Sequence, residues 1–260
     1  MRENLGVKLA PIKIVMVNSR LIKRLKATSI HNFPEYIEYA LSAQGKRSGE
    51  QQYMIDELTT HKTEFFRENE QFDFLKEVVM PEFTNNRNSF FKIWSAGCST
   101  GEEALTMAMI LENYKMNRAG FNYSIEATDV SKGVVDKAIL GVYGGANVLG
   151  LDENLRKKFF EPLKNGNGST IQASKNLRDK IKYSVSNLAA PYTYPNSMFD
   201  VIFCRNTLIY FEDTAKREVV NKLISKIKPG GYLFVGLSET VSQYSKDIKQ
   251  MRPSVYKKIG

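Results

Sequence analysis

A strand-like apolar run that leads into a turn of small residues, at positions 90–103, constrains the fold of this chain most strongly. The run is rich in aromatic and β-branched side chains, which favour a buried strand: Phe90, Phe91, Ile93 and Trp94. Seven small residues follow, from Ser95 to Gly101, and a helix-forming segment begins at Glu102 and Glu103. A strand, a glycine turn and a helix N-terminus in this order are typical of the first βαβ unit of a nucleotide-binding sheet.

The residues of this turn indicate which kind of ligand it would suit. Gly97 can adopt backbone angles that are closed to other residues, and the missing Cβ lets a ligand lie against the main chain. The turn has no Gly-Lys-Ser/Thr sequence, so it is not a phosphate-binding loop, and Glu102 and Glu103 would repel a pyrophosphate. A ligand with ribose hydroxyls and a cationic centre fits better, and S-adenosylmethionine has both. The alternative is an ordinary strand-to-helix turn that binds nothing.

The order of helical and strand signals divides the chain into parts. Residues 1–58 carry only helical signals, residues 59–89 form a linker and a helix, and strands alternate with helices over residues 90–260. The segment at about 141–182 interrupts this alternation with glycines and a strong turn over 164–169, which predicts a small β insert. We therefore expect a Rossmann-like α/β sheet with a small helical N-terminal domain and a small β insert.

Four local predictions are specific enough to be tested by the structure. Residues 42–50 are rich in Ser, Gly, Lys and Gln and predict a loop. Helices are expected over residues 70–82 and 213–227, with Asp213 as the cap of the second. A last strand is expected over residues 254–258.

Polar residues follow the second and fourth predicted strands of the sheet. The second strand ends near Asp129, where a Rossmann-like fold places the carboxylate that accepts hydrogen bonds from both ribose hydroxyls. The alternative role for Asp129 is the N-cap of the next helix, although Ser131 could serve there instead. The fourth strand is followed by Arg205, Asn206 and Tyr210. Open α/β sheets bind ligands at the carboxyl ends of their strands, so these positions are candidate site residues.

Charge and cysteine content limit the partners and the compartment. The net charge of +9 suits either a nucleic acid or an acidic protein surface. Six basic residues and no acidic one lie between Lys8 and Lys26, which indicates a solvated helix face or a docking surface for an acidic helix or phosphates. The two cysteines are too few for a disulfide framework or a zinc site, and we expect no metal. Without a signal peptide or a long apolar run, we expect a cytoplasmic protein that does not insert into membranes.

Four motifs in this order resemble the CheR family within the class I methyltransferases that depend on S-adenosylmethionine. They are Thr-Thr-x-x-Thr-x-Phe-Phe-Arg-Glu at 59–68, Trp-Ser-Ala-Gly-Cys-Ser-Thr-Gly-Glu-Glu at 94–103, Asn-Leu at 187–188 and Phe-Cys-Arg-Asn-x-x-Ile-Tyr-Phe at 203–211. The resemblance covers nearly the whole chain. It implies an enzyme that uses S-adenosylmethionine to esterify glutamates on the signalling helices of chemotaxis receptors, leaving S-adenosylhomocysteine.

Carried over residue by residue, the resemblance also implies the site. The residues that match the family's cofactor contacts, with Gly97 of the turn and His61 added, are His61, Thr63, Arg67, Gly97, Glu103, Asp129, Asn187, Leu188, Arg205 and Asn206. Arg67 and Tyr210 are the predicted catalytic residues, which would orient the incoming glutamate. His61 stands where the family usually has asparagine, yet it can still donate or accept one hydrogen bond. Ala104-Leu105 replaces the usual Pro-Tyr.

The resemblance further implies that the helical domain docks on the acidic receptor bundle, although this domain is shorter than usual. It identifies the insert as the β-subdomain, which in some members binds a receptor C-terminal tail peptide. Two other functions stay open. A nucleic-acid methyltransferase is favoured by the charge, but amino methyltransferases usually carry Asn/Asp-Pro-Pro-Tyr where this chain has Cys-Arg-Asn-Thr, and we expect no nucleic-acid partner. The other is a non-catalytic adaptor that binds S-adenosylmethionine.

Overall fold

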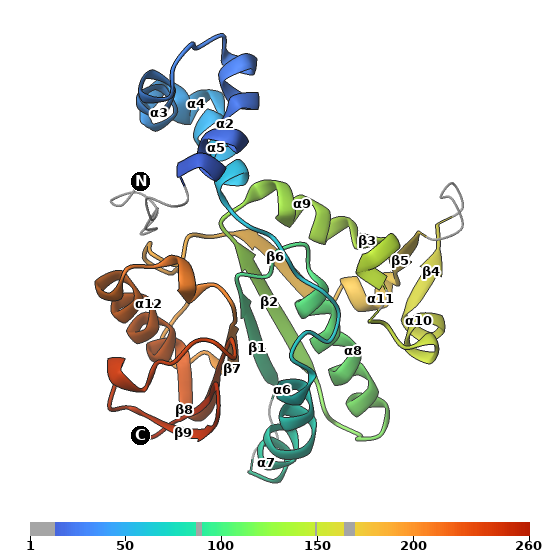
Figure 1. Cartoon of the computed structure of the whole chain (residues 1–260). Coiled ribbons are helices and arrows are strands. Elements are labelled where there is room, and N and C mark those ends of the chain that lie inside the picture. Colours follow the sequence, from blue (N-terminus) through green and yellow to red (C-terminus); the bar gives the residue numbers. More distant parts are fainter. Residues whose placement is uncertain (1–13, 87–89, 149, 164–169) are drawn as a thin grey trace.

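The computed structural model of the chain describes residues 14–86, 90–148, 150–163 and 170–260. Figure 1 shows a bundle of short helices beside a larger body built on a sheet, with a small second sheet at its flank. Within these ranges no helix is both long and apolar enough to span a membrane.

The N-terminal bundle consists, in its described part, of four helices: α2 (Ile14–Thr28), α3 (Phe33–Leu41), α4 (Ala43–Ser48) and α5 (Glu50–Leu58). Asn32 caps α3 as its position suggests, because its side chain accepts a hydrogen bond from the Glu35 N–H at 2.9 Å. Apolar side chains from α2, α3 and α5 form a core of their own: Val17, Leu21, Tyr36, Ala40 and Met54.

Helix α4 stands where the sequence predicts a loop over residues 42–50. The Ser42 hydroxyl caps this helix by accepting a hydrogen bond from the Gly45 N–H at 3.1 Å. Gly45 packs so closely on the end of α3 that a Cβ would collide with the carbonyl of Tyr39. The loop prediction was wrong because a cap and this close helix–helix contact outweigh the weak helix propensity of serine and glycine.

The central sheet has seven strands in the described residues, in the order β6-β2-β1-β7-β8-β10-β9. The first five are parallel, and β10 pairs antiparallel with β8 and β9. The strands are β1 (Phe91–Ala96), β2 (Tyr123–Asp129), β6 (Ile181–Val185), β7 (Phe199–Cys204), β8 (Ile227–Val235), β9 (Ile248–Arg252) and β10 (Val255–Lys258). The chain runs from β1 out to β6 and returns to β7 on the other side of β1. Such a reversal marks where an open α/β sheet binds its ligand.

Helices cover both faces of the sheet (Figure 1), which confirms the predicted α/β class. They include α6 (Asn69–Phe74), α8 (Glu102–Met116), α9 (Lys132–Leu140) and α12 (Asp213–Lys226). Strand β7 is buried at every position, and its side chains alternate between two cores. Phe203 packs with α6 and α8, whereas Ile202 and Cys204 pack with α12.

Three strands form a separate antiparallel sheet at the flank, with β5 (Ile171–Ala173) between β3 (Val142–Tyr143) and β4 (Phe160–Pro162), all within the described residues. The helices η3 (Gly145–Val148), α10 (Glu153–Phe159) and α11 (Lys175–Arg178) accompany it. The predicted turn over 164–169 lies outside the described residues. Phe65 of the linker packs edge-on against Tyr143 and Phe160, with ring centroids 5.1 and 5.6 Å apart, so this sheet also contacts the linker.

Two local predictions need correction, and one strand was not predicted. The helix expected over 70–82 extends from α6 through a π-helical segment, η2 (Leu75–Val79), into α7 (Met80–Asn86). Asp213 is the first residue of α12 and not its cap, and its carboxylate accepts a hydrogen bond from the Tyr244 hydroxyl at 2.6 Å. Strand β9 was missed, because its exposed charged residues give it no apolar alternation.

Candidate active site

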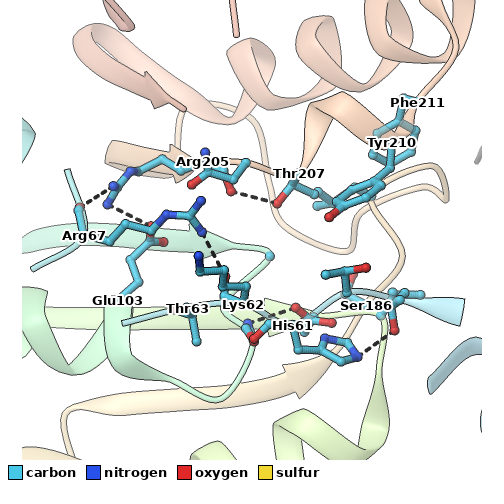
Figure 2. Close-up of a pocket in the computed structure, with 18 of the residues that line it drawn as sticks. His61, Lys62, Thr63, Arg67, Glu103, Ser186, Arg205, Thr207, Tyr210 and Phe211 are labelled. Atoms are coloured by element: carbon cyan, nitrogen blue, oxygen red, sulfur yellow. Dashed lines mark hydrogen bonds and ion pairs between the residues drawn. The ribbon is translucent and has the colours of Figure 1, made fainter. Parts of the chain in front are cut away.

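A pocket opens at the carboxyl edge of the sheet, on the side of β1 where the strand order reverses. It encloses about 1130 Å³, including open solvent at its mouth. Every residue that the sequence predicts for the site lines this pocket: His61, Thr63, Arg67, Gly97, Glu103, Asp129, Asn187, Leu188, Arg205, Asn206 and Tyr210. Figure 2 shows the linker residues His61, Lys62 and Thr63 beside the ends of the strands, with Arg205, Thr207 and Tyr210 across from them. The structure therefore brings together side chains that are far apart in the sequence.

The glycine turn after β1 forms the base of the pocket. The N–H groups of Gly97 and Cys98 donate to the Thr128 carbonyl at 2.8 and 2.9 Å, which ties the turn to the end of β2. Gly97 has a φ of +99°, and a Cβ at this position would collide with the Thr207 hydroxyl. Only glycine satisfies both the backbone angle and the close approach of Thr207.

Asp129 ends β2 with its carboxylate fixed at the wall of the pocket. One oxygen accepts a hydrogen bond from the Ser99 N–H at 2.9 Å, and the other accepts from the Ser131 N–H at 3.0 Å. The N-cap of α9 is Ser131, whose hydroxyl accepts a hydrogen bond from the Val134 N–H. Asp129 is thus free of the capping role that was its alternative, and each oxygen keeps a further lone pair for a hydroxyl of a ligand.

A buried ion-pair cluster of Arg205, Glu68 and Glu103 joins the end of β7 to the linker and to α8. The guanidinium of Arg205 lies 3.1 Å from Glu68 and 3.3 Å from Glu103, and it donates to the Arg67 carbonyl. Only 2% of the Arg205 side chain is exposed. Within the described part of the chain, its Nε–H has no hydrogen-bond partner. A buried donor left without a partner beside a pocket fits a polar ligand there.

Burial raises the pKa of the Glu103 carboxyl, while the charge of Arg205 and the Ser95 hydroxyl act in the opposite direction. Ser95 donates to one oxygen of Glu103 at 2.6 Å and Arg205 to the other. These two donors hold the carboxylate in one orientation at the pocket. A carboxylate held in this way would attract a cationic group of a ligand.

Two glutamates that shape the site were missed by sequence reasoning. Besides its contact with Arg205, Glu68 accepts a hydrogen bond from the Asn206 amide at 3.2 Å. Glu239, which follows β8, accepts from the N–H groups of Asn206, Ile209 and Gly236 at 2.9, 3.1 and 2.6 Å. Burial raises the pKa of Glu239, and these backbone donors oppose the change. The only sequence signal was that Glu68 lies in the Phe-Phe-Arg-Glu motif and Glu239 just beyond a predicted strand.

The linker residues make their own contacts around the pocket. His61 shares a hydrogen bond of 2.7 Å with the Thr59 hydroxyl, and its carbonyl accepts from the Ser99 hydroxyl at 3.2 Å. The partly exposed guanidinium of Arg67 donates to the Lys62 carbonyl at 2.9 Å (Figure 2). In the described residues this is the one hydrogen bond of the Arg67 guanidinium, so its other N–H groups are available to a ligand, while the Arg67 carbonyl is held by Arg205.

The predicted basic face of α2 is partly used within the protein. Arg24 binds Glu50 with two hydrogen bonds of 2.9 and 2.7 Å, and Arg20 donates to the Thr59 carbonyl at 3.1 Å. Lys23 and Lys26 are exposed, whereas Lys8 and Lys13 lie outside the described residues. The basic run is therefore partly structural.

These residues fit S-adenosylmethionine. Asp129 can accept from ribose hydroxyls, Glu103 can bind a cationic group, and the cations of Arg67 and Arg205 can balance a carboxylate. The buried Leu188 lines the pocket together with Ile55 and Leu58, and these side chains offer apolar surface for a base.

Comparisons with known proteins agree with this arrangement. Residues 61–257 match the family described as CheR methyltransferase, SAM binding domain, and residues 1–59 match the CheR methyltransferase all-alpha domain. A chemotaxis protein methyltransferase of Borreliella burgdorferi is 35% identical and covers 98% of this chain and 90% of its own length. Proteins with the same description from Klebsiella aerogenes and Escherichia coli are 33% and 32% identical, covering 96% of this chain and 84% and 85% of their own. The chain therefore belongs to the CheR methyltransferase family, and its methyl donor is S-adenosylmethionine.

Proposed function

We propose that this enzyme transfers a methyl group from S-adenosylmethionine to glutamate side chains of chemotaxis receptors in the cytoplasm, forming glutamate methyl esters. The observation that carries the proposal is the composition of the pocket, in which Glu103 of α8 and Asp129 of β2 meet Arg67 of the linker and Tyr210. The names of the relatives support chemotaxis receptors as the substrate class.

The chemistry demands little acid–base catalysis. A glutamate side chain has a pKa of about 4.3, so it is already a carboxylate nucleophile at neutral pH. Bound S-adenosylmethionine supplies a methyl group on a positively charged sulfur, which is also a good leaving group. The residues of the enzyme therefore have to position the carboxylate and exclude water, and such positioning is worth up to roughly 7–11 kcal/mol in well-oriented systems.

Residues on the sheet side of the pocket would hold the cofactor. We assign Asp129 to the ribose hydroxyls and Glu103 to a cationic group, with Asn187 and Leu188 near the adenine. The Asn187 side chain accepts a hydrogen bond from the Ala189 N–H at 2.9 Å, which fixes its orientation. Gly97 lets the main chain approach the ligand. His61, Thr63, Arg205 and Asn206 complete the cofactor contacts.

Residues on the linker side and after β7 would hold the substrate. A guanidinium can bind a carboxylate through two parallel hydrogen bonds, which suits Arg67 for orienting the incoming glutamate. Tyr210 ends the short helix η4 (Leu208–Tyr210), whose N–H at Ile209 is bound by Glu239. We assign Tyr210 to framing the methyl group from the opposite side.

The two smaller parts of the chain would select the substrate. We assign the helical domain, residues 1–58, to docking on acidic receptor helices, where the exposed Lys23 and Lys26 contribute positive charge. The insert at about 141–182 is the candidate site for a receptor tail peptide.

The test is incubation of the purified chain with radiolabelled S-adenosylmethionine and receptor cytoplasmic fragments, followed by treatment with base. Release of the label as methanol would identify a carboxyl ester. Arg67→Ala should abolish the transfer, whereas Arg118→Ala, at an exposed position between α8 and β2, should keep it. Full activity of Arg67→Ala would refute the role of Arg67.

Two further results of the same experiment would refute the proposal. Label found on added DNA or RNA but not on receptor fragments would favour a nucleic-acid methyltransferase. Calorimetric binding of the cofactor without transfer to any receptor fragment would favour an adaptor role.

A further inference from the structure

The wall of the pocket is not built by the α/β part alone. Ile55 and Leu58, in the last turn of α5, line the pocket together with Thr59 and Thr60. Ile55, Leu58 and Thr59 belong to the all-alpha part of the family match, which ends at residue 59, while the SAM-binding part begins at residue 61. The boundary between the two family domains therefore runs through the pocket.

Two polar side chains of α5 attach this wall to the α/β part. The Gln52 amide donates to the Val130 carbonyl at 3.0 Å and to the Asp56 carboxylate at 2.9 Å. The other oxygen of Asp56 accepts a hydrogen bond from the Gly133 N–H at 3.3 Å, in the first turn of α9. A carboxylate at a helix N-terminus is favoured by the unpaired N–H groups and the helix dipole there.

The attachment point lies directly beside a candidate cofactor residue. Val130 lines the pocket itself and follows Asp129, whose carboxylate binds the Ser131 N–H. Gln52 and Asp56 therefore hold the segment that directly follows Asp129, at Val130 and at Gly133. A movement of α5 would therefore shift Ile55 and Leu58 and, at the same time, disturb the segment that follows Asp129.

We propose that Gln52 and Asp56 are positioning residues for cofactor binding. They hold α5 on segment 130–133, so that Ile55 and Leu58 close the S-adenosylmethionine pocket opposite the strand ends. The helical domain is then part of the cofactor site, in addition to any contact with receptors. This inference rests on the proposed function, because it assumes that the pocket binds S-adenosylmethionine.

The experiment is calorimetric titration of the full chain with S-adenosylhomocysteine, for the parent and for Gln52→Ala/Asp56→Ala. We expect the dissociation constant of the double variant to rise by about tenfold, since two interdomain hydrogen bonds are lost. The matched control is Glu38→Ala/Gln44→Ala, which removes a carboxylate and an amide from exposed positions on α3 and α4. Its dissociation constant should stay within twofold of the parent value.

A second variant separates positioning from folding. A Cβ at Gly133 would lie 3.1 Å from the Asp56 carboxylate, so Gly133→Ala should push α5 away from α9. Alanine is also the better helix former, so the variant should unfold at the same or a higher urea concentration than the parent while binding S-adenosylhomocysteine more weakly. In steady-state assays the KM for S-adenosylmethionine should rise while kcat stays near the parent value.

The outcomes distinguish this inference from the proposed function. If the parent does not bind S-adenosylhomocysteine, the proposed function fails. If the parent binds it and the folded double variant binds it within twofold, only the positioning role of Gln52 and Asp56 is overturned.

Discussion

Replacing Arg205 by methionine would test the buried ion-pair cluster. Methionine keeps part of the apolar stem but removes the charged guanidinium, whose Cζ lies 5.2 Å from the centroid of the Phe72 ring. The side chains of Glu68 and Glu103 are only 13% and 14% exposed, so the variant leaves two largely buried carboxylates without their counter-charge. Removing one partner of a buried ion pair costs about 3–5 kcal/mol of folding free energy. For a marginally stable protein this is about a fifth of the total free energy of unfolding or more.

The pH dependence of this loss follows from protonation. Burial raises the pKa of Glu103 and Arg205 opposes the change, so removal of Arg205 moves the folded-state pKa further above its unfolded value. A carboxyl with a raised pKa binds more protons in the folded state, so stability is greatest below the unfolded pKa and falls as pH rises through the folded pKa. Protonating one carboxyl of unfolded pKa about 4.3 costs about 3.7 kcal/mol at pH 7 and about 1 kcal/mol at pH 5. The deficit of the variant should therefore shrink by more than half between these two pH values.

Urea unfolding followed by circular dichroism at both pH values measures this deficit. The control is Arg118→Met, which removes an arginine from an exposed position and should change the unfolding free energy by less than about 0.5 kcal/mol. A deficit for Arg205→Met below about 1 kcal/mol at pH 7, or one equally large at pH 5, would show that the cluster does not bury charge as we describe.

Three further substitutions test contacts around the pocket and in the helical domain. Gly97→Ala places a Cβ against the Thr207 hydroxyl at a φ of +99°, and calorimetry should show about tenfold weaker binding of S-adenosylhomocysteine or worse. Tyr143→Phe removes the 2.7 Å hydrogen bond to the Thr100 carbonyl, and urea unfolding should show a loss of about 1 kcal/mol. Glu50→Ala removes a buried carboxylate that accepts hydrogen bonds from α2 and α3. The free energy of unfolding, followed by the helical circular-dichroism signal, should fall by about 3 kcal/mol. A dissociation constant or unfolding free energy equal to that of the parent would show that the corresponding contact does not contribute as we describe.

The location of the pocket could be predicted from the sequence because parallel sheets restrict it. The apolar run over residues 199–204 identifies a strand covered on both faces, and the carboxyl ends of such strands meet at one edge. Asp129 ends one strand, and Arg205 and Asn206 directly follow another, so a local reading of the chain was enough to place them together. The glycine turn was also predictable from local sequence, because a positive φ and a close contact at position 97 both require glycine.

The partners of these residues could not be predicted, because packing over long sequence separations decides them. Glu68 meets Arg205 across 137 residues, and Gln52 meets Val130 across 78. The residue type of a glutamate or glutamine does not indicate a distant partner, because most glutamate and glutamine side chains in proteins are exposed to solvent. The same limit explains the loop wrongly expected over residues 42–50, where the close contact of Gly45 with α3 is a property of the folded bundle.

The contacts of Arg205 suggest why the linker, and not the sheet alone, would control methyl transfer. Its guanidinium binds the Arg67 carbonyl, and the Asn206 amide binds Glu68, so two successive residues after β7 hold two successive residues of the linker. The proposed substrate-orienting residue is therefore fixed to the same strand end that presents the proposed cofactor contacts Arg205 and Asn206. Since this reaction needs positioning more than acid–base catalysis, a shift of about 1 Å in the linker could cost on the order of 100-fold in rate. Arg205→Met should therefore lower kcat even at saturating cofactor, and an unchanged kcat would show that Arg67 keeps its position without this contact.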